Sequence, residues 1–137
     1  MRILKTMAAL MAALGIGAAT ASDTEAADLE NTIYLELKDG RVVIELRPDL
    51  APNHVARIKQ LSRAGFYDGI VFHRVIAGFM AQTGDPTGTG TGGSELPDLQ
   101  AEFSGEKHVR GIVSMARSGN PNSANSQFFI VYEDASW

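Results

Sequence analysis

The stretch that most constrains the fold of this chain is residues 72–85, Phe72-His73-Arg74-Val75-Ile76-Ala77-Gly78-Phe79-Met80-Ala81-Gln82-Thr83-Gly84-Asp85. Strand alternation in its first half places Arg74 on the same face as Phe72 and Ile76, so a guanidinium stands among apolar side chains. After a glycine bend, the second half adds further candidate pocket residues, Phe79, Met80 and Gln82. An apolar surface with a few placed hydrogen-bonding groups is typical of a small-ligand or peptide site, and we expect one here.

A second stretch near the C-terminus is expected to meet the first. Alternation places Gln127, Phe129 and Val131 on one face of a strand, so Phe128 is predicted in the core and Phe129 in the pocket. Apolar runs bounded by Gly, Pro, Asn and Ser predict strands within 70–76, 79–82, 112–117 and 127–132.

Residues 32–46 carry the clearest hairpin pattern. Apolar residues alternate with polar ones on both sides of Asp39-Gly40, which is predicted to form a two-residue turn. Pro48 and Pro52 end the second strand, and a helical apolar period then runs from Pro52 to a C-terminal cap at Gly65. The sequence therefore predicts a mainly β domain with one helix against its sheet.

Length and composition narrow the possible classes. A chain of 137 residues accommodates one domain, and 45% apolar with 20% charged residues is ordinary globular usage. The net charge of −4 provides no basic surface for nucleic acid or an anionic membrane. The absence of cysteine excludes disulfides, cysteine-ligated zinc and a thiol nucleophile.

The N-terminus predicts export. Arg2 and Lys5 precede an apolar run over 7–18, and Ala19-Thr20-Ala21 supplies the small residues of a cleavage site. We therefore expect a cleavable signal peptide at 1–21. A permanent membrane anchor is not expected, because the apolar run is shorter than the roughly 20 residues of a membrane-spanning helix. Its removal leaves ten basic and sixteen acidic residues, a net charge of −6. Residues 22–31 are predicted to be a polar, poorly structured tether, and the protein periplasmic or secreted.

Four motifs follow one another in a fixed order: residues 72–85, Gly90-Thr91-Gly92-Gly93, Ile112-Val113-Ser114-Met115-Ala116-Arg117, and residues 123–130. Together they resemble the cyclophilin-type peptidyl-prolyl cis-trans isomerases, from about Thr32 to Trp137, which gives a single domain at 32–137. The resemblance implies an enzyme that accelerates isomerisation of Xaa-Pro bonds and assists folding of exported proteins. It also implies a closed, antiparallel, eight-stranded barrel with capping helices and a groove on its outer wall.

The resemblance assigns roles position by position. It implies that Arg74 and Gln82 are catalytic, and that the substrate-binding residues are Phe79, Met80, Ala116, Arg117, Gln127, Phe129 and Trp137. It implies no cofactor and no metal, and a monomer whose partners are proline-containing peptides and unfolded exported proteins. A tryptophan at position 137 goes with tight cyclosporin binding in the family, so we expect a full-length version to bind cyclosporin and the 137-residue chain to bind it at least tenfold more weakly, a difference of about 1.4 kcal/mol.

This chain departs from the family pattern at several positions. Ala77 stands where the family usually has Pro, Thr83 where it usually has Gly, and Arg117 where eukaryotic members often have Asn. The sequence ends at Trp137, whereas the family continues with closing strands and usually a helix. We therefore expect a partial sequence with an incomplete barrel. Two alternatives stay open, a proline-segment binding or chaperone module with little or no turnover, and an inactive fragment.

Two further features have competing interpretations. His73 suggests a general base or a metal ligand, but alternation points it away from Arg74, which favours a structural or surface histidine. The glycine- and threonine-rich run at 87–93 resembles a phosphate-binding loop, yet it lacks the lysine and the strand-to-helix context of one. We interpret it as a flexible loop at the groove edge.

Overall fold

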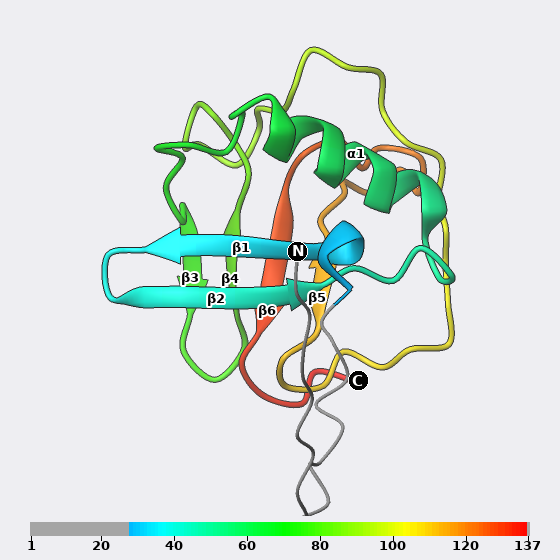
Figure 1. Cartoon of the computed structure of the whole chain (residues 1–137). Coiled ribbons are helices and arrows are strands. Elements are labelled where there is room, and N and C mark those ends of the chain that lie inside the picture. Colours follow the sequence, from blue (N-terminus) through cyan, green and yellow to red (C-terminus); the bar gives the residue numbers. More distant parts are fainter. Residues whose placement is uncertain (1–27, 137) are drawn as a thin grey trace, which may run out of the picture.

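The computed structural model describes residues 28–136. In chain order its elements are η1 (Leu29–Asn31), β1 (Thr32–Leu37), β2 (Gly40–Glu45), α1 (Pro52–Arg63), β3 (Arg74–Ile76), β4 (Met80–Thr83), β5 (Val113–Met115) and β6 (Phe128–Val131). β1 and β2 form one antiparallel sheet, and a second antiparallel sheet has the order β3-β4-β6-β5 (Figure 1). This confirms the mainly β class. The predicted signal peptide and Trp137 lie outside the described residues.

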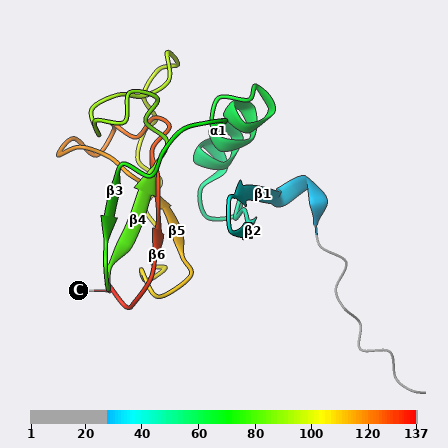
Figure 2. The same ribbon diagram turned by 90° about the vertical axis from the view of Figure 1, so that its left-hand side faces the viewer.

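The four-stranded sheet forms one layer, and the hairpin and α1 lie together beside it (Figure 2). Its central strands supply the core, because Met80 and Val131 are each only 1% exposed. Phe128 is also buried and packs against Tyr67 in a T-shaped arrangement with a centroid distance of 5.6 Å. The Tyr67 hydroxyl donates to the Ser126 carbonyl at 2.9 Å, so the one polar atom of this ring is paired.

The hairpin follows the predicted alternation but turns one residue earlier than expected. Ile33 pairs with the buried Ile44, whereas the neighbouring outward-facing residues, Tyr34 and Val43, are exposed. Leu37 pairs with Gly40, so the two turn residues are Lys38 and Asp39, and the prediction of Asp39-Gly40 was wrong. Gly40 instead opens β2 with a φ of +143°, a conformation that side-chain-bearing residues rarely adopt.

Helix α1 starts and ends where the sequence predicts. Pro52 occupies its first turn, where a missing N–H costs no hydrogen bond. At the other end, Gly65 has a φ of +70° and donates to the Ser62 carbonyl, while Phe66 donates to the Leu61 carbonyl. These two bonds form a Schellman motif, which confirms Gly65 as the C-terminal cap.

The N-terminus of α1 is capped by a distant residue that sequence analysis did not single out. Glu102 accepts the backbone N–H groups of Asn53 and His54 and the Asn53 side-chain amide at 2.6 Å, and the His54 ring Nδ1 lies 2.6 Å from its carboxylate. A carboxylate is favourable here because helix N-termini leave unpaired donors. Glu102 thereby joins the start of α1 to a segment that lies 48 and 49 residues away in the sequence.

Residues 28–136 form two separate antiparallel sheets, and this part of the chain contains no closed barrel; the sequence predicted a barrel that lacks its closing strands. The tether predicted at 22–31 is ordered at its C-terminal end, because Leu29–Asn31 form η1 with Asp28 as its N-cap. Glu30 then pairs with Lys59 and Arg63 on α1, which joins this segment to the helix. The polar sequence of residues 22–31 gave no indication of these ion pairs, because their partners lie on α1.

Candidate active site

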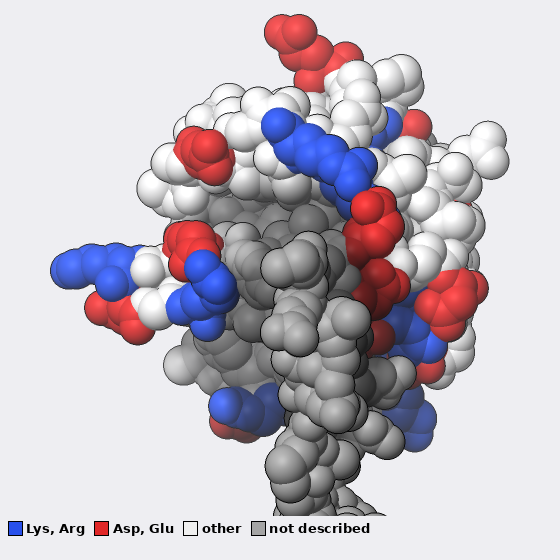
Figure 3. All heavy atoms as spheres, viewed as in Figure 1, with Lys and Arg blue, Asp and Glu red and all other residues white. Residues whose placement is uncertain are grey.

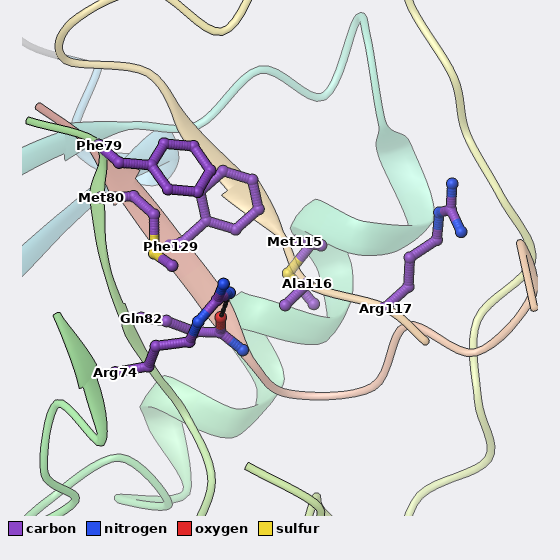
Figure 4. A pocket seen from close by; sticks show the side chains of 8 residues that line it. All are labelled: Arg74, Phe79, Met80, Gln82, Met115, Ala116, Arg117 and Phe129. Atoms are coloured by element: carbon purple, nitrogen blue, oxygen red, sulfur yellow. Dashed lines mark hydrogen bonds between the residues drawn. The ribbon is translucent and has the colours of Figure 1, made fainter. Parts of the chain in front are cut away.

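One pocket opens on the four-stranded sheet. It has a volume of about 420 Å³ and is lined by Arg74, Phe79, Met80, Gln82, Met115, Ala116, Arg117 and Phe129 (Figure 4). These residues come from β3, β4, β5 and β6 and from the segments that adjoin them. The pocket is therefore built by the pairing of strands that are far apart in sequence.

Strand register explains why the polar and apolar groups meet. Arg74 lies opposite Gln82 in the β3–β4 pair, and Gln82 lies opposite Phe129 in the β4–β6 pair. Directly opposed residues project from the same face of a sheet, so these three side chains form one row. The guanidinium and the amide thus stand beside an aromatic ring.

A chain of hydrogen bonds runs from this row to the loop at 85–93. Arg74 Nη1 donates to Gln82 Oε1 at 3.3 Å, and Figure 4 shows the two side chains pointing toward each other. Gln82 Nε2 donates to Gln127 Oε1 at 2.8 Å. Gln127 Nε2 donates in turn to the carbonyls of Gly90 at 3.0 Å and Gly92 at 2.8 Å. The side chain of Arg74 is therefore linked to a loop on another part of the chain.

The loop folds around Asp85, which is only 1% exposed. Burial by itself raises the pKa of this carboxyl, but hydrogen bonds from the Thr87 hydroxyl and N–H and from the N–H groups of Gly92 and Gly90 outweigh burial and hold the pKa below its ordinary value. A Cβ on Gly92 would overlap Asp85 Oδ1, so only glycine allows this close approach. The loop expected to be flexible is thus held by hydrogen bonds.

Apolar and aromatic groups form the rest of the pocket. Met80 is buried, and Phe129 stacks on His108 with centroids 5.7 Å apart and an interplanar angle of 21°. His108 lies outside the helices and strands, and its ring supports a pocket residue. Arg117 points away from the other lining side chains in Figure 4, and its guanidinium lies 5.6 Å from the ring centroid of the exposed Phe103.

Acidic and basic side chains are interspersed on the face shown in Figure 3. Among residues 28–136, no helix is long and apolar enough to cross a membrane, and no cluster of three or more His, Cys, Asp or Glu is placed to hold a metal. The two ring nitrogens of His73 are buried without a hydrogen-bond partner, and the ring lies close to Gly90.

Comparison with known proteins identifies the family. The family model for cyclophilin-type peptidyl-prolyl cis-trans isomerases matches residues 32–137. The chain belongs to this family. A probable peptidyl-prolyl cis-trans isomerase of Brucella suis is 60% identical over 93% of this chain and 69% of the relative. Peptidyl-prolyl cis-trans isomerase B of Bacillus subtilis is 47% identical over 74% of this chain and 72% of the relative. The activity of this family is isomerisation of Xaa-Pro bonds.

Solved cyclophilins share the fold. A Cryptosporidium parvum cyclophilin, crystallised in the presence of the dipeptide Ala-Pro, has a TM-score of 0.72 and 35% identity over 77% of this chain and 70% of its own. The cyclophilin AquaCyp293 of Hirschia baltica has a TM-score of 0.70 and 31% identity over 77% of this chain and 59% of its own. The cyclophilin fold of the described residues is thereby established.

Most residues expected to serve a cyclophilin active site lie in or beside the pocket. The pocket is lined by seven of them, Arg74, Phe79, Met80, Gln82, Ala116, Arg117 and Phe129. Gln127 stands behind Gln82, to which it is hydrogen bonded, and Trp137 lies outside the described residues. Met115 is an additional lining residue, and its place between Ser114 and Ala116 in the third motif was the available signal.

Proposed function

We propose that this cyclophilin isomerises Xaa-Pro bonds in the pocket around Arg74, with Arg74 and Gln82 as its catalytic residues. The observation that carries the proposal is the placement of the guanidinium and amide opposite each other across β3 and β4, next to the apolar surface of Met80 and Phe129. The family activity and the pocket chemistry point to the same reaction.

The reaction requires stabilisation of a twisted amide. Rotation about an Xaa-Pro bond breaks the C–N resonance, which gives a barrier near 18–20 kcal/mol for peptide bonds and relaxation over tens to hundreds of seconds. In the twisted state the proline nitrogen becomes pyramidal and gains a lone pair. A donor held near that nitrogen stabilises the transition state more than the planar ground state, so no covalent bond has to change.

Arg74 has the properties that this step needs. A guanidinium keeps its positive charge throughout the physiological pH range and offers several donors in a planar fork, so it can contact the proline nitrogen and the prolyl carbonyl together. Gln82 provides a second polar group beside it. The apolar surfaces of Phe79, Met80 and Phe129 suit a proline ring, and they exclude water that would weaken the interactions of Arg74.

The other groove residues are proposed to hold the peptide on either side of proline. Ala116 and Arg117 line the pocket where β5 ends, and the Ala116 N–H donates to the Gln127 carbonyl at 2.9 Å. This bond fixes the edge along which an extended peptide would lie. Trp137 is proposed to complete the groove and to contribute to cyclosporin binding through its apolar ring and N–H. Trp137→Ala should weaken cyclosporin binding at least tenfold in a calorimetric titration, and unchanged affinity would refute this role.

Export belongs to the same proposal. The charged and apolar pattern of residues 1–21 supports a cleavable signal peptide and a function in the periplasm or outside the cell. The match of the family model supports a domain at 32–137. The substrates would then be unfolded exported proteins, and the isomerase would act on them as a monomer. A reporter fused after Ala27 should be exported from a bacterial cell, and its retention in the cytosol would refute the localisation.

Peptide exchange measured by NMR tests the proposed activity. With a short peptide containing Ala-Pro, the protein should produce exchange between cis and trans signals and shift the resonances of Met80, Gln82 and Phe129. Shifts without exchange would favour the alternative, a proline-binding module without turnover. Exchange with no change at these residues would place the reaction elsewhere.

A further inference from the structure

Asp85 is the most enclosed carboxylate near the pocket, and the mechanism above does not use it. Its Oδ1 accepts the N–H and hydroxyl of Thr87, both at 2.8 Å. Its Oδ2 accepts the N–H groups of Gly90 at 2.6 Å, Gly92 at 3.1 Å and Thr89 at 3.2 Å, and the Thr89 hydroxyl lies at 3.5 Å. Within residues 28–136 no Lys, Arg or His pairs with it, so backbone dipoles and hydroxyls alone stabilise this charge.

The loop that Asp85 organises also holds Gln127. Gly90 and Gly92 donate their N–H groups inward to Asp85 Oδ2 and present their carbonyls to Gln127 Nε2. Both protons of the Gln127 amide are therefore engaged by carbonyls whose positions depend on the carboxylate. If the carboxylate released the loop, these two acceptors would lose their fixed spacing.

The backbone carbonyls of the loop determine the donor and the acceptor of each hydrogen bond in this network. Backbone carbonyls only accept hydrogen bonds, so Gln127 must turn its NH₂ toward them and its Oε1 toward Gln82. Gln82 must then present its NH₂ to Gln127, which leaves Gln82 Oε1 facing the guanidinium of Arg74, a group that only donates. Each amide has one allowed orientation, and a rotation of either would place two donors or two acceptors together.

We propose that Asp85 is a positioning residue for isomerisation, which acts through Gly90, Gly92, Gln127 and Gln82 to hold the guanidinium of Arg74 over the pocket. The inference rests on the proposed role of Arg74. It assigns the loop at 85–93 a part in the reaction that does not require contact with the peptide. Arg74 is exposed and has many rotamers, so a fixed acceptor at Gln82 reduces the conformational entropy lost when it engages the twisted amide.

A double-mutant cycle on the full chain tests this chain of contacts. Asp85→Asn replaces an acceptor-only carboxylate by a group of similar size with one acceptor oxygen and two donors. We expect kcat for a proline-containing peptide to fall about tenfold with KM within threefold, and the side-chain amide resonances of Gln127 to shift. In an Arg74→Ala background, the same Asp85→Asn change should lower kcat by less than twofold, because the residue through which it acts is gone.

Asp98→Asn is the matched control. Asp98 also accepts a side-chain amide nearby, from Asn125 at 2.9 Å, but it lies outside the network that leads to Arg74, and kcat should not change. If Asp85→Asn does not fold, Thr87→Val replaces it, since it removes one donor from the carboxylate, and a fall in kcat of about threefold is expected.

Three outcomes would overturn the inference. A kcat for folded Asp85→Asn, or for its substitute Thr87→Val, within 1.5-fold of wild type would show that the loop does not position the site. An equal loss in the presence and absence of Arg74 would show that Asp85 acts independently of it. Wild-type activity in Arg74→Ala alone would instead refute the proposed function, and the positioning role with it.

Discussion

The buried Asp85 and the partly buried Glu102 are two carboxylates that accept similar hydrogen bonds in different parts of the fold. Glu102 accepts the backbone N–H groups at the start of α1, 48 and 49 residues away, whereas Asp85 accepts N–H groups from residues two to seven positions along its own loop. The first joins distant segments, and the second shapes one segment whose carbonyls accept hydrogen bonds from Gln127, the partner of the pocket residue Gln82. The comparison predicts that loss of Glu102 lowers the stability of the fold without changing the pocket, whereas loss of Asp85 changes the geometry of the pocket.

The largest effect on stability is expected from Glu102→Ala. The substitution removes the acceptor of the Asn53 and His54 N–H groups and of the His54 ring, and the side chains of His54 and Glu102 are only 11% and 12% exposed. We expect the free energy of unfolding to fall by about 3 kcal/mol, the upper range for hydrogen bonds to a charged group. Urea denaturation measures this, and kcat/KM of the folded protein should remain within twofold of wild type. A large loss of activity at full stability would contradict the comparison.

Acid should remove the contribution of Glu102 in a defined pH range. Burial tends to raise its pKa, but hydrogen bonds from the His54 ring and from Asn53 and His54 N–H groups lower the pKa to about 2. Because the folded-state pKa lies below the ordinary value of 4.5, the stabilisation is present above about pH 5 and is lost as the pH falls toward 2.

The difference in unfolding free energy between wild type and Glu102→Gln should therefore shrink as pH falls from 5 to 2. Chemical denaturation at several pH values measures this difference. A difference that stays constant down to pH 2 would mean that the carboxylate charge does not provide the stabilisation.

A smaller effect is expected at the opposite end of the same helix. Gly65→Ala forces a side chain into a backbone with φ of +70° and places its Cβ about 3.2 Å from Asp68 Oδ2. The left-handed conformation should cost about 1 kcal/mol of stability. Thermal unfolding should show a modest fall in Tm, and isomerase activity should not change. A loss of activity would indicate that α1, and not only the loop at 85–93, controls the pocket.

The sequence predicted local features better than distant ones. Alternation and capping identified the hairpin, α1 and the core position of Phe128, because each depends on neighbours within a few residues. The family motifs named the residues that the β3-β4-β6-β5 pairing gathers into the pocket. The capping role of Glu102 had no local signal, since its partners lie 48 and 49 residues away.

Other features depended on backbone geometry that composition does not encode. The one-residue shift of the hairpin turn follows from the pairing of Leu37 with Gly40. The hydrogen bonds of Asp85 come mostly from backbone N–H groups, so side-chain patterns could not reveal them, and the glycine-rich run suggested flexibility instead. The ion pairs of Glu30 likewise required the position of α1 to be known.

The account depends most directly on the isomerisation rate of Arg74→Ala, with Arg117→Ala as the matched control. Both arginines line the pocket, but only Arg74 contacts Gln82, while Arg117 points away from the other lining side chains. We predict that kcat/KM falls about a hundredfold in Arg74→Ala and recovers only partly in Arg74→Lys. In Arg117→Ala we expect kcat to stay at the wild-type value and KM to rise no more than about threefold, because Arg117 is proposed to hold the peptide and not the reacting bond. An Arg74→Ala protein that is folded and as active as wild type would contradict the central claim.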